Sequence, residues 1–179
     1  MKPFLITPEE ATRKLKEGAY TVGVFGFGRV GSVIGIGWAL AGAKVIGATL
    51  DTNSLKLMEQ GVSPYPEEAY LSKYLKTLID MRKLELTNDF SYVSRKSDIK
   101  IIAVPAYLSE DGKPDLNPVK STATEIGRGL CRGDVVIVET SLPPGTTRKI
   151  IRPILEKESG LKADEDFCLA YSPERISAG

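Results

Sequence analysis

The sequence alternates short, strongly apolar runs with longer segments of helical character. The apolar runs lie at 20–25, 44–51, 83–87, 99–105, 134–140 and 166–172. Most of them are almost continuously apolar and rich in β-branched residues, as expected for strands that are buried on both faces. Helices are predicted between them at 29–42, 54–60, 67–82, 118–131 and 146–158. This alternation predicts βαβ units and therefore an α/β fold with a parallel sheet covered on both sides.

Six strands fit the doubly wound order 3-2-1-4-5-6 of a Rossmann fold. An additional amino-terminal helix is predicted, with Thr7 as its N-cap, Pro8 at its first position and Glu10 at the capping-box position. The expected organisation is therefore a helical extension over 1–19 and one Rossmann domain over 20–179. The segment 63–83 is longer than a usual connection, and we interpret it as an inserted helix over one edge of the sheet.

Composition excludes several classes of function. The chain has 179 residues, 42% of them hydrophobic, and a net charge of +1, which indicates one globular domain without a basic footprint for nucleic acid. No run of about 18 apolar residues is present to span a membrane, and the amino terminus lacks a secretory signal, so a cytoplasmic protein is expected. Histidine is absent, and Cys131 and Cys168 form no CxxC pair. We therefore expect no metal site, no disulfide framework and no histidine-dependent base.

A glycine motif follows the first predicted strand. In "VGVFGFGRVG", Gly26, Gly28 and Gly31 stand in GxGxxG spacing. In a dinucleotide-binding loop the first glycine permits the turn, the second lets the pyrophosphate approach the backbone, and the third lets helix and strand pack closely. The helix predicted from Arg29 would direct its free N–H groups and its positive dipole end at the phosphates.

Asp51 stands at the predicted end of the second strand, 20 residues after Gly31. A carboxylate there can accept both ribose hydroxyls of the adenosine half and would repel a 2′-phosphate, so NAD is preferred over NADP. Two alternatives stay open: a chance coincidence of glycine packing with a surface aspartate, and an S-adenosylmethionine methyltransferase, which also carries an acid on its second strand. A protein kinase is excluded, because no HRD or DFG triplet follows.

The later strand ends carry more specific motifs. The fourth, fifth and sixth strands run into "AVPAYLSEDGKPDL", "ETSLPPGTT" and "AYSPERISAG". On these motifs the chain, from about residue 20 to its last residue, resembles the amino-terminal NAD-binding domain of the UDP-glucose/GDP-mannose dehydrogenase family. It looks most like the members that oxidise UDP-N-acetylhexosamines, such as UDP-N-acetyl-mannosamine.

The resemblance implies a double oxidation, in which two NAD molecules take the C6 alcohol of a UDP-sugar through an aldehyde to a carboxylate. In the family a cysteine, which traps the aldehyde, and a lysine follow "PER...G", beyond the part that this chain matches. The expectation is therefore a cofactor domain that binds NAD without turnover, while the complete enzyme is a homodimer or larger. The competing interpretation is a stand-alone NAD-binding regulatory or scaffold module.

The resemblance also assigns cofactor contacts. Gly26 to Gly31, with Val30, match the pyrophosphate loop, and Arg29 stands where the family often has an aromatic residue, which suggests a guanidinium contact to phosphate. Asp51 matches the ribose acid. Two further matches are a basic residue over the adenosine half and the loop after the fourth strand, which are Lys56 and the run Val104, Pro105 and Ala106. The family's usual Thr-Pro is Ala106-Tyr107 here.

Two catalytic candidates come from the same resemblance. Ser141 matches a threonine whose hydroxyl helps to place the hydrolytic water or the nicotinamide, and Glu174 matches an active-site glutamate that acts as base or orients water. Ala178 stands where the UDP-glucose enzymes have a second glutamate, which favours the acetamido-sugar branch. Without the resemblance, Ser141 reads as a turn residue and Glu174 as a carboxylate at a helix start. Both cysteines are expected to be inert, buried thiols.

Overall fold

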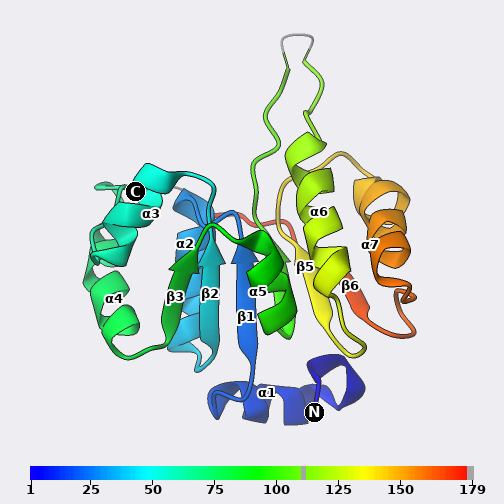
Figure 1. The fold of residues 1–179 in the computed structure, drawn as a ribbon, viewed down its shortest axis with the longest axis horizontal. Coiled ribbons are helices and arrows are strands. Elements are labelled where there is room, and N and C mark those ends of the chain that lie inside the picture. Colours follow the sequence, from blue (N-terminus) through cyan, green and yellow to red (C-terminus); the bar gives the residue numbers. More distant parts are fainter. Residues whose placement is uncertain (110–111, 177–179) are drawn as a thin grey trace.

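The fold is a single six-stranded parallel sheet with the order β3-β2-β1-β4-β5-β6 (Figure 1). The computed structural model describes residues 1–109 and 112–176. The strands are β1 (Thr21–Phe25), β2 (Lys44–Ala48), β3 (Leu84–Thr87), β4 (Ile99–Ile102), β5 (Val135–Val138) and β6 (Cys168–Tyr171). The predicted doubly wound α/β fold and its strand order are confirmed.

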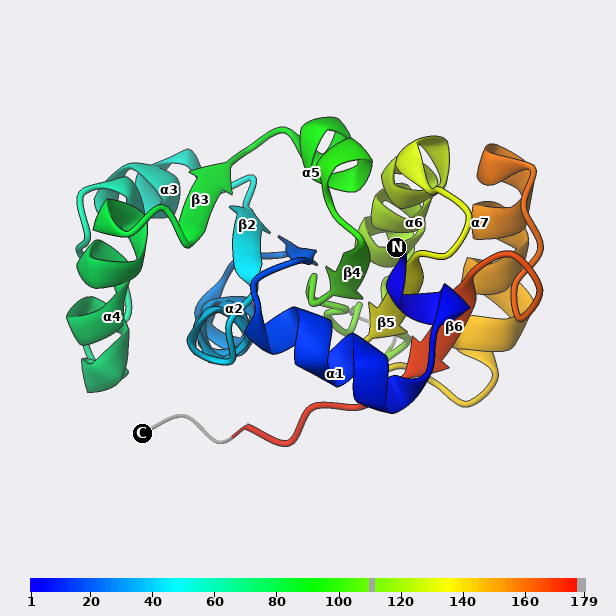
Figure 2. The ribbon, with the colours of Figure 1, turned by 90° about the horizontal axis from the view of Figure 1, so that it is seen from below.

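Helices cover both faces of the sheet. They are α1 (Pro8–Lys16), α2 (Arg29–Leu40), α3 (Thr52–Glu59), α4 (Ala69–Asp80), α5 (Phe90–Lys96), α6 (Asn117–Gly129) and α7 (Arg152–Ser159), with a 3-10 turn η1 (Pro3–Leu5) and a π-helical turn η2 (Thr147–Ile151) before α7. Helices α5, α6 and α7 lie on one face and α2 on the other, while α1 crosses beneath the amino ends of the strands (Figures 1 and 2). No helix in the described ranges is long and apolar enough to cross a membrane.

Alternating side chains of the strands pack into two separate hydrophobic cores, one on each face of the sheet. On β1, Val22 and Val24 pack with Ile36 of α2 and Leu75 of α4, whereas Phe25 packs on the opposite face with residues of α5, α6 and α7. This alternation follows from the two-residue period of a strand. Because both faces are covered by apolar helix surfaces, the strands had to read as nearly continuous apolar runs.

The amino-terminal helix follows the predicted capping pattern. Helix α1 begins at Pro8, and the Thr7 hydroxyl accepts a hydrogen bond from the Glu10 amide at 3.3 Å. Helix α6 begins one residue earlier than predicted, at Asn117, and its N-cap is Leu116. The inserted helix in the segment 63–83 is α4.

One strand end and one helix in the first half of the domain differ from the prediction in ways that matter for the site and the fold. Strand β2 ends at Ala48, so Asp51 is not its last residue but the N-cap of α3, which begins at Thr52. Helix α5 was not predicted, because seven residues give too short an apolar pattern. Its local signal is Asp89, whose side chain accepts from the Tyr92 amide at 2.8 Å as an N-cap does.

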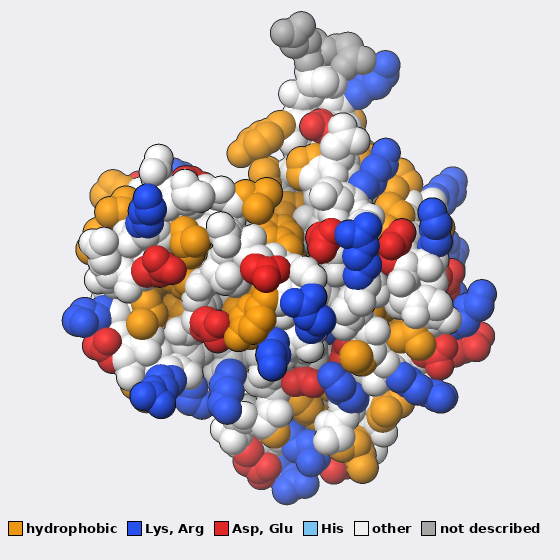
Figure 3. Space-filling view, in the orientation of Figure 1, with side chains coloured by type: hydrophobic (Ala, Val, Ile, Leu, Met, Phe, Trp, Pro, Cys, Tyr) orange, Lys and Arg blue, Asp and Glu red, His pale blue; other side chains and the backbone are white. Residues whose placement is uncertain are grey.

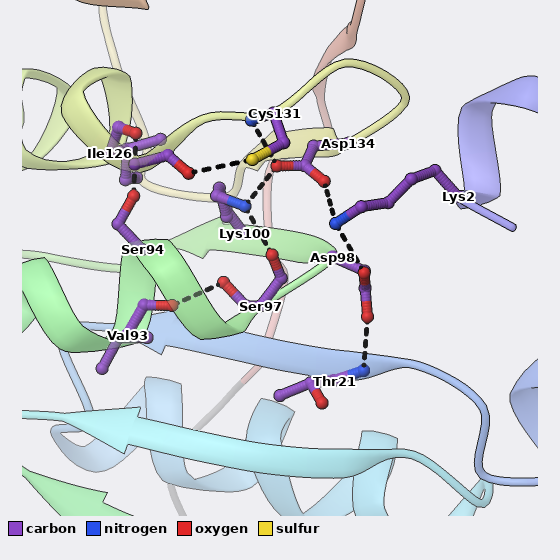
Figure 4. Close-up of polar contacts among 11 residues, drawn as sticks. Lys2, Thr21, Val93, Ser94, Ser97, Asp98, Lys100, Ile126, Cys131 and Asp134 are labelled. Carbon is purple, nitrogen blue, oxygen red and sulfur yellow. Dashed lines mark hydrogen bonds and ion pairs between the residues drawn. The ribbon is translucent and has the colours of Figure 1, made fainter.

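A buried ion pair joins β4 to the start of β5. Lys100 and Asp134 are 0% and 1% exposed, and their side chains lie 2.7 Å apart (Figure 4). Lys100 also donates to the Ser97 carbonyl at 2.6 Å, and Asp134 accepts from the Cys131 amide at 2.8 Å. Burial lowers the pKa of Lys100 below its ordinary value, although the Asp134 charge opposes this shift. Such a pair is tolerated because its partners satisfy one another.

The amino terminus completes this cluster. The Lys2 ammonium lies 2.8 Å from Asp134 Oδ1 and 2.7 Å from Asp98 Oδ1, and Asp98 Oδ2 accepts from the Thr21 amide at 3.0 Å (Figure 4). Burial alone would lower the pKa of Lys2, but its hydrogen bonds with Asp134 and Asp98 raise it to about 12. Two lysines and two aspartates therefore balance, and Lys2 ties the first residues of the chain to β1, β4 and β5.

We predict that Lys2→Met lowers the free energy of unfolding by about 1–2 kcal/mol, because Asp134 Oδ1 is left buried without a cation; partial exposure of Lys2 keeps the loss below that of a fully buried pair. Since the pKa of Lys2 is raised from its ordinary value of 10.5 to about 12 in the folded protein, this stabilisation is complete at neutral pH and is lost as pH rises from 10.5 through about 12. Urea unfolding measures it. The exposed Lys16→Met serves as control, and equal losses in the two variants would contradict the assignment.

Candidate cofactor-binding site

A cavity of about 900 Å³ opens at the carboxyl ends of the strands. Every strand contributes to its lining through residues that follow it. These are Gly26 and Gly28 to Gly31 after β1, Thr49 to Asp51 after β2, Asn88 after β3, Ala103 to Tyr107 after β4, Glu139 to Ser141 after β5 and Glu174 after β6. The strand order reverses between β1 and β4, and doubly wound folds bind their ligands at this switch point. Figure 3 shows the surface hollowed beside the projecting segment that joins β4 to α6, with hydrophobic side chains along the hollow.

The three glycines of the loop differ in what surrounds them. Gly26 has a φ of +96°, and a Cβ there would lie 2.6 Å from the Val104 nitrogen. A Cβ on Gly31 would lie 2.1 Å from the Gly26 carbonyl oxygen, so helix α2 packs tightly on the turn. A Cβ on Gly28 would meet only the Tyr65 hydroxyl, at 3.7 Å. Gly28 therefore leaves open space for a ligand to approach the backbone.

Helix α2 presents its amino end to the cavity. Gly28 is its N-cap and offers no capping side chain, and the amides of Arg29, Val30 and Gly31 have no acceptor within the helix. All three residues line the cavity. The Phe27 amide donates to the Ala48 carbonyl at 2.7 Å, which fixes the loop against the end of β2. Free amides and the positive dipole end make this a phosphate-binding arrangement.

Asp51 lines the same cavity on the β2 side. Its carboxylate accepts from the Asn53 amide at 3.0 Å, from the Ser54 amide at 3.2 Å and from the Ser54 hydroxyl at 2.6 Å. The Ser54 hydrogen bonds hold the pKa of Asp51 below its ordinary value, so the group is ionised at neutral pH. Lys56 is exposed on α3 and is not among the lining residues. The structure thus brings Asp51, but not Lys56, to the glycine loop.

The ends of β4 and β5 are tied together at the cavity. The Thr140 hydroxyl donates to the Val104 carbonyl oxygen at 2.8 Å and also lies within hydrogen-bond distance of the Ile102 carbonyl oxygen, at 3.3 Å. This contact sets the neighbouring Ser141, which is exposed, beside the loop of Val104, Pro105 and Ala106. At this turn Thr140 bonds to the backbone of β4 and leaves Ser141 to line the cavity.

Two glutamates lie near each other after the carboxyl ends of β5 and β6. The Glu174 amide donates to the Glu139 carbonyl at 3.3 Å, and Glu174 Oε2 accepts from the Ile176 amide at 2.8 Å. Both side chains line the cavity. Burial raises the pKa of Glu139 above its ordinary value, and the Glu174 charge adds to the rise. Ala178, the basis for the acetamido-sugar preference, lies outside the described residues.

Several residues that line the cavity were not predicted from the sequence. Thr140 and Glu139 directly precede the predicted Ser141, so the same strand-end argument would have included them. Tyr107 follows Ala106 in the loop after β4. Tyr65 reaches the cavity from the segment between α3 and α4, and no sequence pattern points to it.

Neither cysteine lines the cavity. Cys168 is half-buried in β6, and burial raises the pKa of its thiol, as expected for an inert group. The expectation of burial for Cys131 is wrong, because that side chain is exposed just after α6.

A tight glycine turn, an open helix amino end and an ionised aspartate after β2 together define a dinucleotide-binding Rossmann domain. The residues fit the pyrophosphate and the adenosine ribose of NAD, because Gly28 leaves room where a side chain would stand. The family model described as "UDP-glucose/GDP-mannose dehydrogenase family, NAD binding domain" matches residues 20–179. The chain belongs to this family, and NAD is its cofactor.

The names of similar proteins agree with this family assignment. A UDP-N-acetyl-D-glucosamine 6-dehydrogenase from Pseudomonas aeruginosa is 31% identical over 163 residues, covering 88% of this chain and 36% of the relative. A UDP-N-acetyl-D-mannosamine dehydrogenase from Pyrococcus horikoshii is 32% identical over 158 residues, covering 88% of this chain and 37% of the relative. The chain thus spans little more than a third of the length of these relatives.

Solved structures share the fold. GDP-mannose dehydrogenase from Pseudomonas aeruginosa matches with a TM-score of 0.82 and 29% identity over 88% of this chain and 36% of its own. An NDP-N-acetyl-D-galactosaminuronic acid dehydrogenase from Methanosarcina mazei matches with a TM-score of 0.82 and 32% identity over 94% of this chain and 38% of its own. The relatives of this chain are NAD-dependent oxidoreductases that act on nucleotide sugars.

We predict different effects for two glycine variants, one mainly on stability and the other mainly on NAD binding. Gly31→Ala should lower the free energy of unfolding by about 2 kcal/mol, because its methyl group would collide with the Gly26 carbonyl. Gly28→Ala should lose at most about 1 kcal/mol of stability, because alanine is a poorer N-cap than glycine. It should bind NAD about tenfold more weakly, because the methyl group would stand between the backbone and the pyrophosphate. Urea unfolding and calorimetric titration measure the two effects. Unchanged NAD affinity in Gly28→Ala would contradict the loop assignment.

A second prediction concerns pH. Because the folded pKa of Glu139 is raised, the folded protein keeps a proton that the unfolded chain has already released, so stability falls as pH rises through that window. Glu139→Gln cannot ionise and should gain stability relative to the unmodified protein as pH rises from about 4 to about 8. Urea unfolding across this range tests it. A constant difference between the two proteins would show that Glu139 is not perturbed.

Proposed function

We propose that this chain is the NAD-binding part of a nucleotide-sugar 6-dehydrogenase. The complete enzyme would oxidise the C6 alcohol of a UDP-sugar, a UDP-N-acetylhexosamine, to a carboxylate with two NAD. The observation that carries the proposal is the cavity at the switch point, where the glycine loop, Asp51, Ser141 and Glu174 share one lining. The names of the relatives, which act on UDP-N-acetylhexosamines and GDP-mannose, support the substrate class.

The first step is cofactor binding. The amides at the start of α2 and the Arg29 guanidinium would hold the pyrophosphate, and the Asp51 carboxylate would accept the ribose hydroxyls. Lys56, on the exposed face of α3, would reach the adenosine half from outside the cavity. NAD, when bound, supplies the hydride acceptor. A 2′-phosphate would meet the ionised Asp51, so NADP is disfavoured.

The second step is placement of the reacting groups. Val104, Pro105 and Ala106 would pack against the nicotinamide side of the cofactor and exclude water there. Ser141 would position the nicotinamide or the hydrolytic water through its hydroxyl. Glu174 would take a proton from that water or orient it, and the neighbouring Glu139 holds its own proton to a higher pH than a free carboxyl does.

The thiol that the family uses is not supplied by this site. Cys168 lies within β6, and Cys131 lies after α6 towards the opposite edge of the sheet. We therefore propose that this chain binds NAD without turning over a UDP-sugar. The complete enzyme would act in the cytoplasm as a homodimer or larger assembly, with a further part supplying the thiol, a lysine and most UDP contacts.

One experiment tests these steps together. Calorimetry should show NAD binding, with NADP at least about tenfold weaker because of Asp51, and Asp51→Asn should narrow that gap. NADH absorbance with NAD and a panel of UDP-glucose, UDP-N-acetylglucosamine and UDP-N-acetylmannosamine should show no turnover. Steady turnover would show that the catalytic thiol lies within this chain, and absent NAD binding would refute the cofactor site.

A further inference from the structure

The cavity lining is poor in positive charge. Among the described residues that line it, Arg29 is the only cation, whereas Asp51, Glu125, Glu139 and Glu174 are carboxylates. A dinucleotide brings a negatively charged pyrophosphate to the glycine loop beside Arg29. The state of this one guanidinium therefore controls the charge that the pyrophosphate meets.

The guanidinium of Arg29 already has a partner. It forms an ion pair with the Glu67 carboxylate and lies over the Tyr65 ring, with Cζ 5.7 Å from the ring centroid. Both partners come from the segment between α3 and α4. The Arg29 and Glu67 side chains are 48% and 36% exposed, so water solvates the pair and its net contribution is small. An ion pair of this kind gives way readily to a competing anion.

Backbone hydrogen bonds hold Tyr65 in a position beside both Arg29 and the glycine loop. Its amide donates to the Ser63 hydroxyl at 3.0 Å, and its carbonyl accepts from the Glu68 amide at 3.0 Å. The ring lines the cavity, and the hydroxyl lies 3.7 Å from the point where a Cβ on Gly28 would stand. The aromatic platform for Arg29 thus directly borders the space left open for the pyrophosphate.

We propose that Glu67 is the resting counter-ion of Arg29, and that the cofactor pyrophosphate competes with it for the guanidinium while Tyr65 keeps Arg29 beside the loop. The inference rests on the proposed binding of NAD at this loop. Because the Arg29–Glu67 ion pair must be given up when the pyrophosphate takes the guanidinium, Glu67 opposes cofactor binding. Glu67 and Tyr65 are positioning residues, and Arg29 is the group that touches the cofactor.

The test compares ligands with and without phosphate. Glu67→Gln should bind NAD and ADP-ribose about three- to tenfold more tightly at low salt, because the competing charge is gone. Its affinity for adenosine should not change. Glu59→Gln removes the same charge from an exposed position on α3 and controls for overall charge; its affinity for NAD should stay within about twofold.

A double variant isolates the exchange. Arg29→Met should weaken NAD binding, and in that background Glu67→Gln should add nothing, because no guanidinium remains to compete for. Weaker binding in Glu67→Gln, or the same gain with and without Arg29, would overturn the inference. Absent NAD binding to the unmodified protein would refute the cofactor site instead, so the two failures are distinct.

Discussion

Parallel pairing of all six strands is the constraint on which the site depends. Parallel strands send every carboxyl end to one edge of the sheet, and the loops that leave this edge carry the glycines, Asp51, Ser141 and Glu174. The contact of Gly31 with the Gly26 carbonyl then brings the start of α2 against β1. Chain direction, more than any single side chain, thus assembles residues that are up to about 150 positions apart.

The two edges of the sheet handle charge in opposite ways. At the amino edge, two lysines and two aspartates are paired directly, two of them fully buried, and the sum is neutral. At the carboxyl edge the lining is mostly acidic, and the positive counterparts are backbone amides and one solvated arginine. A buried, balanced cluster favours a fixed structure, whereas an exposed and unbalanced lining can respond to a charged ligand.

The sequence was sufficient for the topology because nearly every strand is a continuous apolar run. It was sufficient for the glycine loop because turn, strand and helix each constrain the same three positions. It failed where local signals are weak. Asp51 is the N-cap of α3 rather than the last residue of β2. The main sequence signal for α5 is its N-cap, Asp89. Tyr65 and Glu67 reach Arg29 only through the path of an irregular segment, and the buried Lys100 reads as a surface residue until Asp134 is found beside it.

The ion pairs of Lys2 distinguish two ways to define this domain, by the range that its family shares and by the contacts that hold it together. The family model matches from residue 20, just before β1, yet the first residues of the chain neutralise carboxylates at the amino ends of β4 and β5. The range that the family model matches and the range that these ion pairs hold together therefore have different limits. A truncation at residue 20 would remove Lys2 and leave two aspartates with one lysine, and therefore a net negative charge, at the amino ends of these strands.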